Sequence, residues 1–269
     1  VTINPIWMFG PYVPNAVSAG SQPDWYMGFL DGAVRIMPGI DLHVFGHPLS
    51  LNLMIPAMLL PPIMLVLAGA YPWIESWVTG DKREHHLLDR PRNAATRTAL
   101  GAAFVTFYGV LWLAGGNDLM AITFGMSINT LIVTFRVLVF VLPVLAFWVT
   151  KRIALSLQRK DRDLLLHGRE TGRIVRLPHG EFIEVHAPIS AAEKAVIMSK
   201  VDVQPLPLPP VRDANGVRHP AGRLARARSR MSGFFYNDNV PLPSAAEIAE
   251  AEAHLAHVEA AADHSELSH

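Results

Sequence analysis

Three long apolar stretches without a formal charge, or with a single one, constrain the fold of this chain more than any other feature. They run from Pro48 to Ile74, from Thr98 to Asn117 and from about Ile128 to Thr150, the last with Arg136 inside it. As a helix, the first stretch would measure about 40 Å, enough to cross a hydrocarbon core of about 30 Å. None of the three has the polar face that a helix on a soluble protein needs. We therefore predict an all-α membrane protein with three transmembrane helices.

The Lys and Arg residues near these stretches lie almost entirely on one side of the predicted membrane. On the other side, only Arg35 precedes the first stretch, and none lies between Asn117 and Ser127. Because cytoplasmic loops carry the excess of cations, we expect a cytoplasmic C-terminal tail and an N-terminal segment on the outer side of the plasma membrane. The cations that predict the cytoplasmic side are Lys82, Arg83, Arg90, Arg92, Arg97, Lys151, Arg152, Arg159, Lys160 and Arg162.

The composition agrees with a membrane protein that also has a polar tail. The chain is 51% hydrophobic and 17% charged, and its formal net charge is +0, so nothing indicates nucleic acid as a partner. It has no cysteine, which excludes disulfides and Cys-ligated metal or iron–sulfur centres within the chain. It opens on a Pro- and Gly-rich stretch, so we expect it to begin partway through a larger fold.

A short amphipathic segment precedes the first apolar stretch. Residues 25–37, "WYMGFLDGAVRIM", are too few to span a bilayer and predict a helix lying at the outer interface. Asp24 stands where a carboxylate could cap this helix. Asp31 and Arg35 are four residues apart, a spacing that predicts an ion pair on its surface.

The stretch "QPDWY", followed by "MGFLDGAVRIMPG", resembles the Pro-Glu-Trp-Tyr loop of cytochrome b, the membrane subunit of quinol:cytochrome c reductases, with Asp24 in place of Glu. The order of outer loop, short helix and three spans is similar to the C-terminal half of that family. "GPYVPNAVSAGSQPD", "LLDRPRNAATRT" and "LLLHGRETGRIVRLPHGEFIEVH" are most similar to the actinobacterial form, which carries a long cytoplasmic extension. The resemblance covers about residues 1–190.

The resemblance implies a quinol-oxidation site at the outer face of a proton-translocating respiratory complex, with menaquinol as the substrate. In the family, the loop carboxylate takes a proton from the quinol and passes it outward, while one electron goes to a Rieske iron–sulfur protein and the other to haem b. Asp24 and Tyr26 match the reacting positions of the loop, and Pro23 and Trp25 match its framework. Asp is one methylene shorter than Glu, which reduces its reach by roughly 1.5 Å, so we expect a bridging water or a shifted loop.

Several apolar side chains near the loop could line a quinone pocket. For any one of them taken alone, ordinary helix packing is the favoured explanation, and the pocket interpretation stays open as the alternative. The candidates are Met27, Phe29, Leu30, Leu53 and Ile55.

None of the 12 histidines lies within a predicted span. Cytochromes b hold their haems through intramembrane histidines of the N-terminal half, so the resemblance implies that the haem ligands lie outside this chain. The adjacent His85 and His86, and the pair His43 and His47, are better explained as solvated side chains than as metal ligands, and we predict no metal site. The implied partners are the N-terminal haem-binding half, a Rieske protein, a cytochrome c subunit, a terminal oxidase and the lipid bilayer.

We expect three parts: an outer loop and short helix over residues 1–45, three transmembrane helices over 46–152, and a largely irregular cytoplasmic extension over 153–269. Within the extension, a charged helix should continue to His167, a β-like turn should form around "LPHGEFIEVH", and "VQPLPLPPV" should be extended. "RLARARSRM" is basic enough to lie on an anionic membrane surface, and the C-terminal end should form an Ala/Glu helix.

Two other interpretations remain. The chain could be a non-catalytic membrane anchor, or a truncated fragment, with a degenerate quinol site. It could also be part of a small transporter or channel, although it shows no internal repeat and no paired intramembrane charges. Arg136 could reach the outer interface, or pair with Asp118 or a partner subunit.

Overall fold

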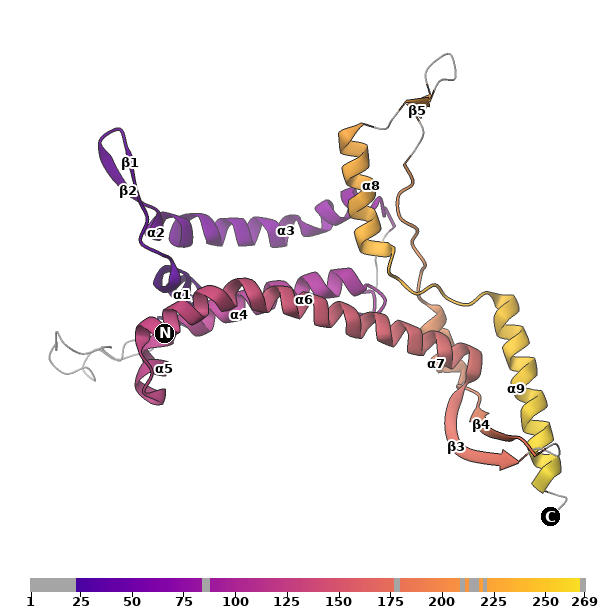
Figure 1. Ribbon diagram of the computed structural model, residues 1–269. Coiled ribbons are helices and arrows are strands. Elements are labelled where there is room, and N and C mark those ends of the chain that lie inside the picture. The colour runs from indigo at the N-terminus through magenta and orange to yellow at the C-terminus, as the bar shows by residue number, and fades with distance from the viewer. Residues whose placement is uncertain are drawn as a thin grey trace. The chain divides into compact units, whose positions relative to one another are not determined.

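The computed structural model describes residues 23–83, 88–176, 180–208, 211–212, 218–219 and 222–266. The N-terminal loop before residue 23 and the pair His85 and His86 lie outside these ranges. Within them the chain is mostly helical, and three helical segments are long and apolar enough to cross a membrane (Figure 1). They are Leu51–Thr79, Ala95–Gly115 and Ile128–His167. Their length and composition confirm the prediction of three helices able to span a membrane.

The first spanning segment begins three residues later than predicted. It is built from α2 (Leu51–Leu53), a π-helical turn η2 (Met54–Leu59) and α3 (Leu60–Thr79). Pro56 lies in the π-helical turn, which accommodates the missing N–H of proline by widening the helix locally.

A β-hairpin precedes this segment, where we predicted none. Strands β1 (Asp41–Val44) and β2 (His47–Ser50) pair antiparallel, and Pro48 lies opposite His43. Phe45 (φ 52°) and Gly46 (φ 80°) form the two-residue turn. Both have the positive φ that a tight hairpin turn of this length requires. His43 and His47 therefore lie on two strands of a hairpin rather than on one face of a helix.

The chain divides into two compact units, the first made of residues 1–75 and 99–150. The first unit contains α1 (Gly28–Ile36), the hairpin, α5 (Asn117–Phe124) and most of the apolar residues of α3, α4 (Ala95–Gly115) and α6 (Ile128–His167). Its core joins one face of α1 to α4, α5 and α6, while many large apolar side chains point outward, as expected for helices in lipid. The core residues are Ala33, Ile36, Val110, Leu111, Ala114, Ala121, Leu131, Phe135 and Val139.

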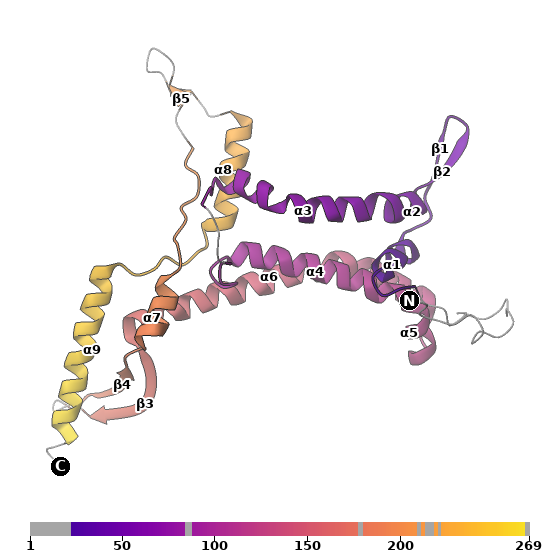
Figure 2. The same cartoon turned by 180° about the vertical axis from the view of Figure 1, so that it is seen from behind.

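The second unit contains residues 76–98 and 151–269, and here the prediction of a largely irregular extension is wrong. The hairpin of β3 (Arg169–Arg176) and β4 (Phe182–Ala187) is followed by α7 (Ala191–Met198), α8 (Arg223–Tyr236) and α9 (Ala245–Glu266), which Figure 2 shows from behind. A short hairpin of β5 (Val211–Arg212) and β6 (Arg218–His219) precedes α8. The helix to His167 and the hairpin after it are confirmed.

Local capping signals explain the regular structure of the extension. The hydroxyl of Ser190 accepts a hydrogen bond from the N–H of Glu193 at the start of α7. Ser244 and Glu247 form a reciprocal capping box at the start of α9: the N–H of Ser244 donates to the Glu247 carboxylate (2.6 Å) and the N–H of Glu247 to the Ser244 hydroxyl (3.2 Å). These hydrogen bonds satisfy N–H groups that have no partner inside the helix.

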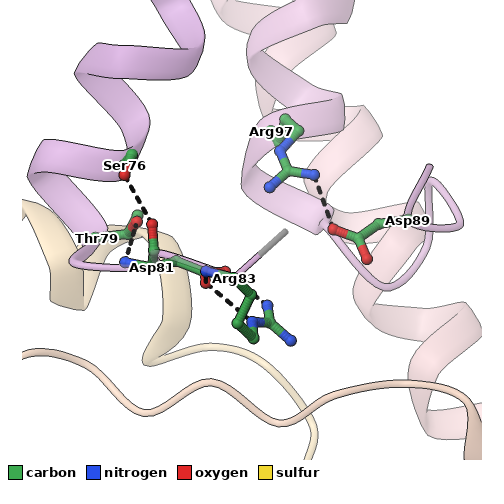
Figure 3. Close-up of polar contacts among 6 residues, drawn as sticks. All are labelled: Ser76, Thr79, Asp81, Arg83, Asp89 and Arg97. Atoms are coloured by element: carbon green, nitrogen blue, oxygen red, sulfur yellow. Dashed lines mark hydrogen bonds and ion pairs between the residues drawn. The ribbon is translucent and has the colours of Figure 1, made fainter. Parts of the chain in front are cut away.

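Hydrogen bonds and ion pairs of charged residues hold the loop that follows α3, as Figure 3 shows. Arg83 holds both carboxylate oxygens of Asp81, at 2.9 and 2.6 Å, while the backbone carbonyl of Asp81 accepts from Ser76 (2.7 Å). Arg97, at the start of α4, pairs with Asp89 at 2.8 Å. Arg83 and Arg97 are thus among the predicted cytoplasmic cations that pair with acids. The prediction of sidedness is unaffected, because it counts Lys and Arg rather than net charge.

Candidate functional site

The loop from Pro23 to Tyr26 leads directly into α1. The N–H of Met27 donates to the carbonyl of Asp24 (2.8 Å), which closes a turn before the helix. The N-cap of α1 is Met27, and no side chain caps it. The prediction that the Asp24 carboxylate caps the helix is therefore wrong, because the helix begins too far along the chain for that carboxylate to reach its first N–H groups.

The Asp24 carboxylate instead pairs with Tyr26. The phenol donates a hydrogen bond of 2.5 Å to Oδ2 of Asp24. This bond and the negative charge of Asp24 raise the pKa of Tyr26 above its ordinary value of 10.0, so the phenol stays protonated and donating at neutral pH. Oδ1 of Asp24 has no hydrogen-bond partner in the described part of the chain, so it can accept a hydrogen bond from a ligand.

Trp25 and Tyr26 present their rings outward. Their side chains are 71% and 52% exposed, and the two rings meet edge to face at 5.9 Å. The backbone behind them is held, because the indole N–H of Trp112 in α4 donates to the carbonyl of Trp25 (2.9 Å). The loop therefore has an anchored backbone and exposed aromatic side chains.

Glycines bring α1 against α4 at close range. A Cβ at Gly32 would lie 1.8 Å from the carbonyl oxygen of Leu111, and one at Gly115 would lie 2.6 Å from the carbonyl oxygen of Gly28. Only glycine allows the two backbones to approach this closely. We did not predict this contact from the sequence, although the four-residue spacing of Gly28 and Gly32 is the usual signal for it.

Arg35 fixes the other end of α1. Its Nε lies 2.7 Å from Asp31, which confirms the predicted pair, and its Nη1 reaches Asp118 and Asn117 at the start of α5, each at 2.9 Å. Burial raises the pKa of Asp31 above its ordinary value, an effect that the neighbouring Arg35 opposes. Sequence reasoning missed this contact between α1 and α5 because its partners are far apart along the chain.

Arg136 completes the attachment of α1. Its Nε donates a hydrogen bond of 2.5 Å to the backbone carbonyl of Ile36, the last residue of the helix. We predicted that Arg136 reaches the outer interface or pairs with Asp118 or a partner subunit. In the structure it donates to a carbonyl at a helix end, and its position relative to the interface stays a prediction. Such carbonyls have no partner inside their own helix.

The candidate pocket residues fall into two groups. Phe29 packs against the core of the first unit and its ring lies 5.1 Å from that of Tyr108, so its helix-packing role is established, and Leu30 is half-buried. Met27, Leu53 and Ile55 remain exposed, and the π-helical turn that carries Ile55 contacts α1. Contact of any of these residues with a quinol stays a prediction.

The spanning helices offer no pair of haem ligands. No histidine lies in α3 or α4, and the only one in α6 is its last residue, His167. Among the described residues no group of three or more His, Cys, Asp or Glu is placed to hold a metal ion. The described parts of the spanning helices therefore supply no pair of histidines that could hold a haem.

The chain is similar to curated proteins over most of its length. It is 50% identical over 251 residues to a cytochrome bc1 complex cytochrome b subunit of Streptomyces coelicolor, a match covering 93% of this chain and 46% of the relative. Subunits of the same name from Corynebacterium diphtheriae and Mycobacterium leprae are 40% and 38% identical, over 99% and 93% of this chain. No family model matches the chain.

These matches confirm the resemblance predicted from the loop, and they extend beyond residue 190 into the C-terminal extension. The chain spans about half the length of the curated relatives it matches, as expected for a half-length cytochrome b sequence.

Proposed function

We propose that this chain, homologous over most of its length to actinobacterial cytochrome b subunits, supplies the C-terminal half of such a subunit and part of its quinol-oxidation site. The observation that carries the proposal is the pairing of Asp24 with Tyr26 on an anchored loop, in the stretch that resembles the quinol loop. Residues 1–45 form the outer segment of the site, residues 46–152 the membrane part and residues 153–269 a cytoplasmic extension.

The proposed chemistry is proton removal from menaquinol at the outer face of the plasma membrane. Oxidation of a quinol releases two electrons and two protons, so a base must lie near a ring hydroxyl. Asp24 accepts a proton on Oδ1 and releases it to the outer solution, while Tyr26 holds Oδ2 in place. Pro23 and Trp25 shape the loop, and α1 lies at the interface with Met27, Phe29, Leu30, Leu53 and Ile55 as candidate contacts for the quinol.

The proposal includes partners that complete the electron path. When bound in the complex, the Rieske cluster and the b haems accept the electrons of the quinol. The haem ligands belong to an N-terminal half of cytochrome b, since this chain has no suitable histidines in its spans. A cytochrome c subunit and a terminal oxidase would follow in the same respiratory chain.

The test is Asp24→Asn in the assembled complex. We expect menaquinol oxidation to fall on the order of a hundredfold or more, the usual contribution of a general base, with the haem content unchanged. Asp41→Asn is a matched control, because Asp41 is also an outer-segment aspartate that accepts a hydrogen bond from a hydroxyl, that of Ser50 at 2.5 Å. Unchanged turnover in Asp24→Asn would contradict the proposal.

A second measurement separates a working subunit from a non-catalytic anchor. The chain is tagged, purified gently from its native membranes and examined by a reduced-minus-oxidised spectrum, with the copurifying chains identified. A b-haem band together with a Rieske protein is the expected result. A preparation without haem and without partners would favour the anchor with a degenerate site.

A further inference from the structure

The outward face of α8 (Arg223–Tyr236) is not part of the proposed quinol loop, and its composition is distinctive. Three arginines and three large apolar side chains share this face, and all are exposed, with Leu224 at 68%, Phe234 at 49% and Met231 at 45%. None of the three arginines has an acidic partner among the residues that the structure describes. They are Arg223, Arg226 and Arg230.

Hydrogen bonds and ring contacts join α8 to residues next to the ends of the apolar stretches. Arg228 donates to the carbonyl of Trp77, in the last turn of α3, and its guanidinium lies 5.8 Å from the Trp77 ring. The hydroxyl of Thr96, in the first turn of α4, is bonded to the carbonyls of Phe234 and Phe235 at 3.3 and 3.2 Å.

The third spanning helix makes an equivalent contact. Lys151 follows directly after the apolar stretch of α6, pairs with Asp238 at 2.8 Å and lies 4.8 Å from the Phe234 ring. Contacts thus join α8 to residues at the ends of all three apolar stretches. In the predicted topology, those residues lie at the level where hydrocarbon gives way to lipid headgroups.

The rotation of α8 about its own axis is also fixed. Ser232, which is fully buried, accepts from the N–H of Leu206 (3.0 Å), and Ser229 donates to the carbonyl of Leu206 (2.9 Å). Both serines lie on the face opposite the arginines. The arginine face is therefore held outward.

We propose that α8 lies on the membrane surface at the cytoplasmic ends of the spanning helices and binds anionic lipid headgroups. Arg223, Arg226 and Arg230 contact the lipid phosphates, while Leu224, Met231 and Phe234 enter the boundary between headgroups and acyl chains. Charge complementarity and the contacts to the helix ends select this partner. The lipid contact of α8 depends on the proposed topology but not on the quinol site. Disproof of the quinol site would therefore leave the lipid contact standing, and the reverse also holds.

The test uses the absence of cysteine from the chain. A single cysteine introduced as Met231→Cys carries an environment-sensitive fluorophore, and the purified protein with its native partners is placed in nanodiscs of phosphatidylcholine, with or without phosphatidylglycerol. The same preparation without the introduced cysteine supplies the background. We expect the emission to shift to the blue with phosphatidylglycerol and the shift to disappear at high salt.

Substitutions test which arginines cause the emission shift. Arg223→Gln, Arg226→Gln and Arg230→Gln together should abolish the shift, reducing the preference for anionic lipid on the order of a hundredfold. Arg169→Gln, Arg173→Gln and Arg176→Gln remove the same charge from β3 and should leave the shift intact. A label at Ala249→Cys, on an exposed position of α9, gives the emission expected in water.

Three results would overturn the proposal. Emission at position 231 equal to that at position 249 in both lipids would mean that α8 faces water. Emission already shifted in detergent and in both lipids would mean that a partner protein covers the helix. A salt-sensitive shift that survives loss of the three arginines would assign the lipid contact to other cations.

Discussion

At the scale of single residues, the pair Asp24 and Tyr26 defines the candidate site. The phenol fixes one carboxylate oxygen and leaves the other available, which gives a short aspartate a defined direction. Both side chains are accessible to solvent. The proposed role of Asp24 requires this access, because the carboxylate must contact both a substrate and water.

Replacement of Tyr26 by Phe should slow menaquinol oxidation two- to tenfold, a smaller effect than Asp24→Asn, because Tyr26 is exposed and water can replace its hydrogen bond to Asp24. The pKa of Tyr26 is raised above 10.0, so the phenol donates at all lower pH values and loses its proton only as the pH rises past that range. The ratio of wild-type to Tyr26→Phe rates should therefore be constant from about pH 6 to 9. Steady-state rates across this range check it, and a ratio that changes would show that Tyr26 titrates there.

At the scale of secondary structure, the crossing of α1 and α4 positions the loop. Glycine on both helices permits backbone contact, and the Trp112 indole uses that proximity to reach the Trp25 carbonyl. The Arg35 and Arg136 contacts then hold the far end of α1. The orientation of the loop thus depends on a helix that carries no reacting group.

Gly32→Ala should displace α1 and disturb the site. The new methyl group would lie 1.8 Å from the Leu111 carbonyl oxygen, which is backbone and has no room to move aside. We expect a loss of about 1–3 kcal/mol in stability, as for other overpacked contacts, and reduced menaquinol oxidation. Thermal unfolding in detergent and turnover measure the two effects.

Gly39→Ala is the control for this experiment, since nothing lies within 4 Å of the position that its Cβ would take. It should leave both stability and turnover unchanged. Equal behaviour of the two variants would show that the close approach of α1 and α4 is unimportant for the site.

At the scale of the whole molecule, buried polar contacts organise the unit that contains the C-terminal extension. The Gln158 side chain, 4% exposed, donates to the carbonyl of Arg92 (2.5 Å) and accepts from the N–H of Val240 (2.9 Å). Arg92 also pairs with Asp161 at 2.6 Å. One residue of α6 therefore joins the loop after α3 to the segment between α8 and α9.

Gln158→Ala should loosen this attachment. It leaves a buried N–H and a buried carbonyl without their partner, at a cost of about 1–3 kcal/mol each. We expect faster limited proteolysis in residues 199–208 and 237–244, while the spanning helices stay protected. Arg159→Ala, at the exposed neighbouring position, should digest like the wild type, and equal digestion of the Gln158 variant would contradict the role of this amide.

Much of the fold could be predicted because its signals are local. The length of the apolar stretches, the asymmetry of Lys and Arg and the spacing of Asp31 and Arg35 each depend on residues close together in the chain. The Ala/Glu helix at the C-terminal end is confirmed as α9. The prediction was wrong for the stretch before it, where α7, capped by Ser190, and α8 form in a part that we expected to be largely irregular.

By itself, the sequence determined the three spanning segments, their predicted sidedness and the loop whose resemblance identifies the relatives. Only the tertiary structure decided that Asp24 binds Tyr26 rather than capping α1, that Arg35 reaches α5, and that Arg136 satisfies the carbonyl of Ile36. The physical reason is that some signals are local in the chain, whereas others depend on contacts between distant segments. Burial of apolar length and capping act within a few residues, whereas the partner of a polar side chain is chosen by which helices pack together, and here glycines at Gly28, Gly32 and Gly115 set that packing.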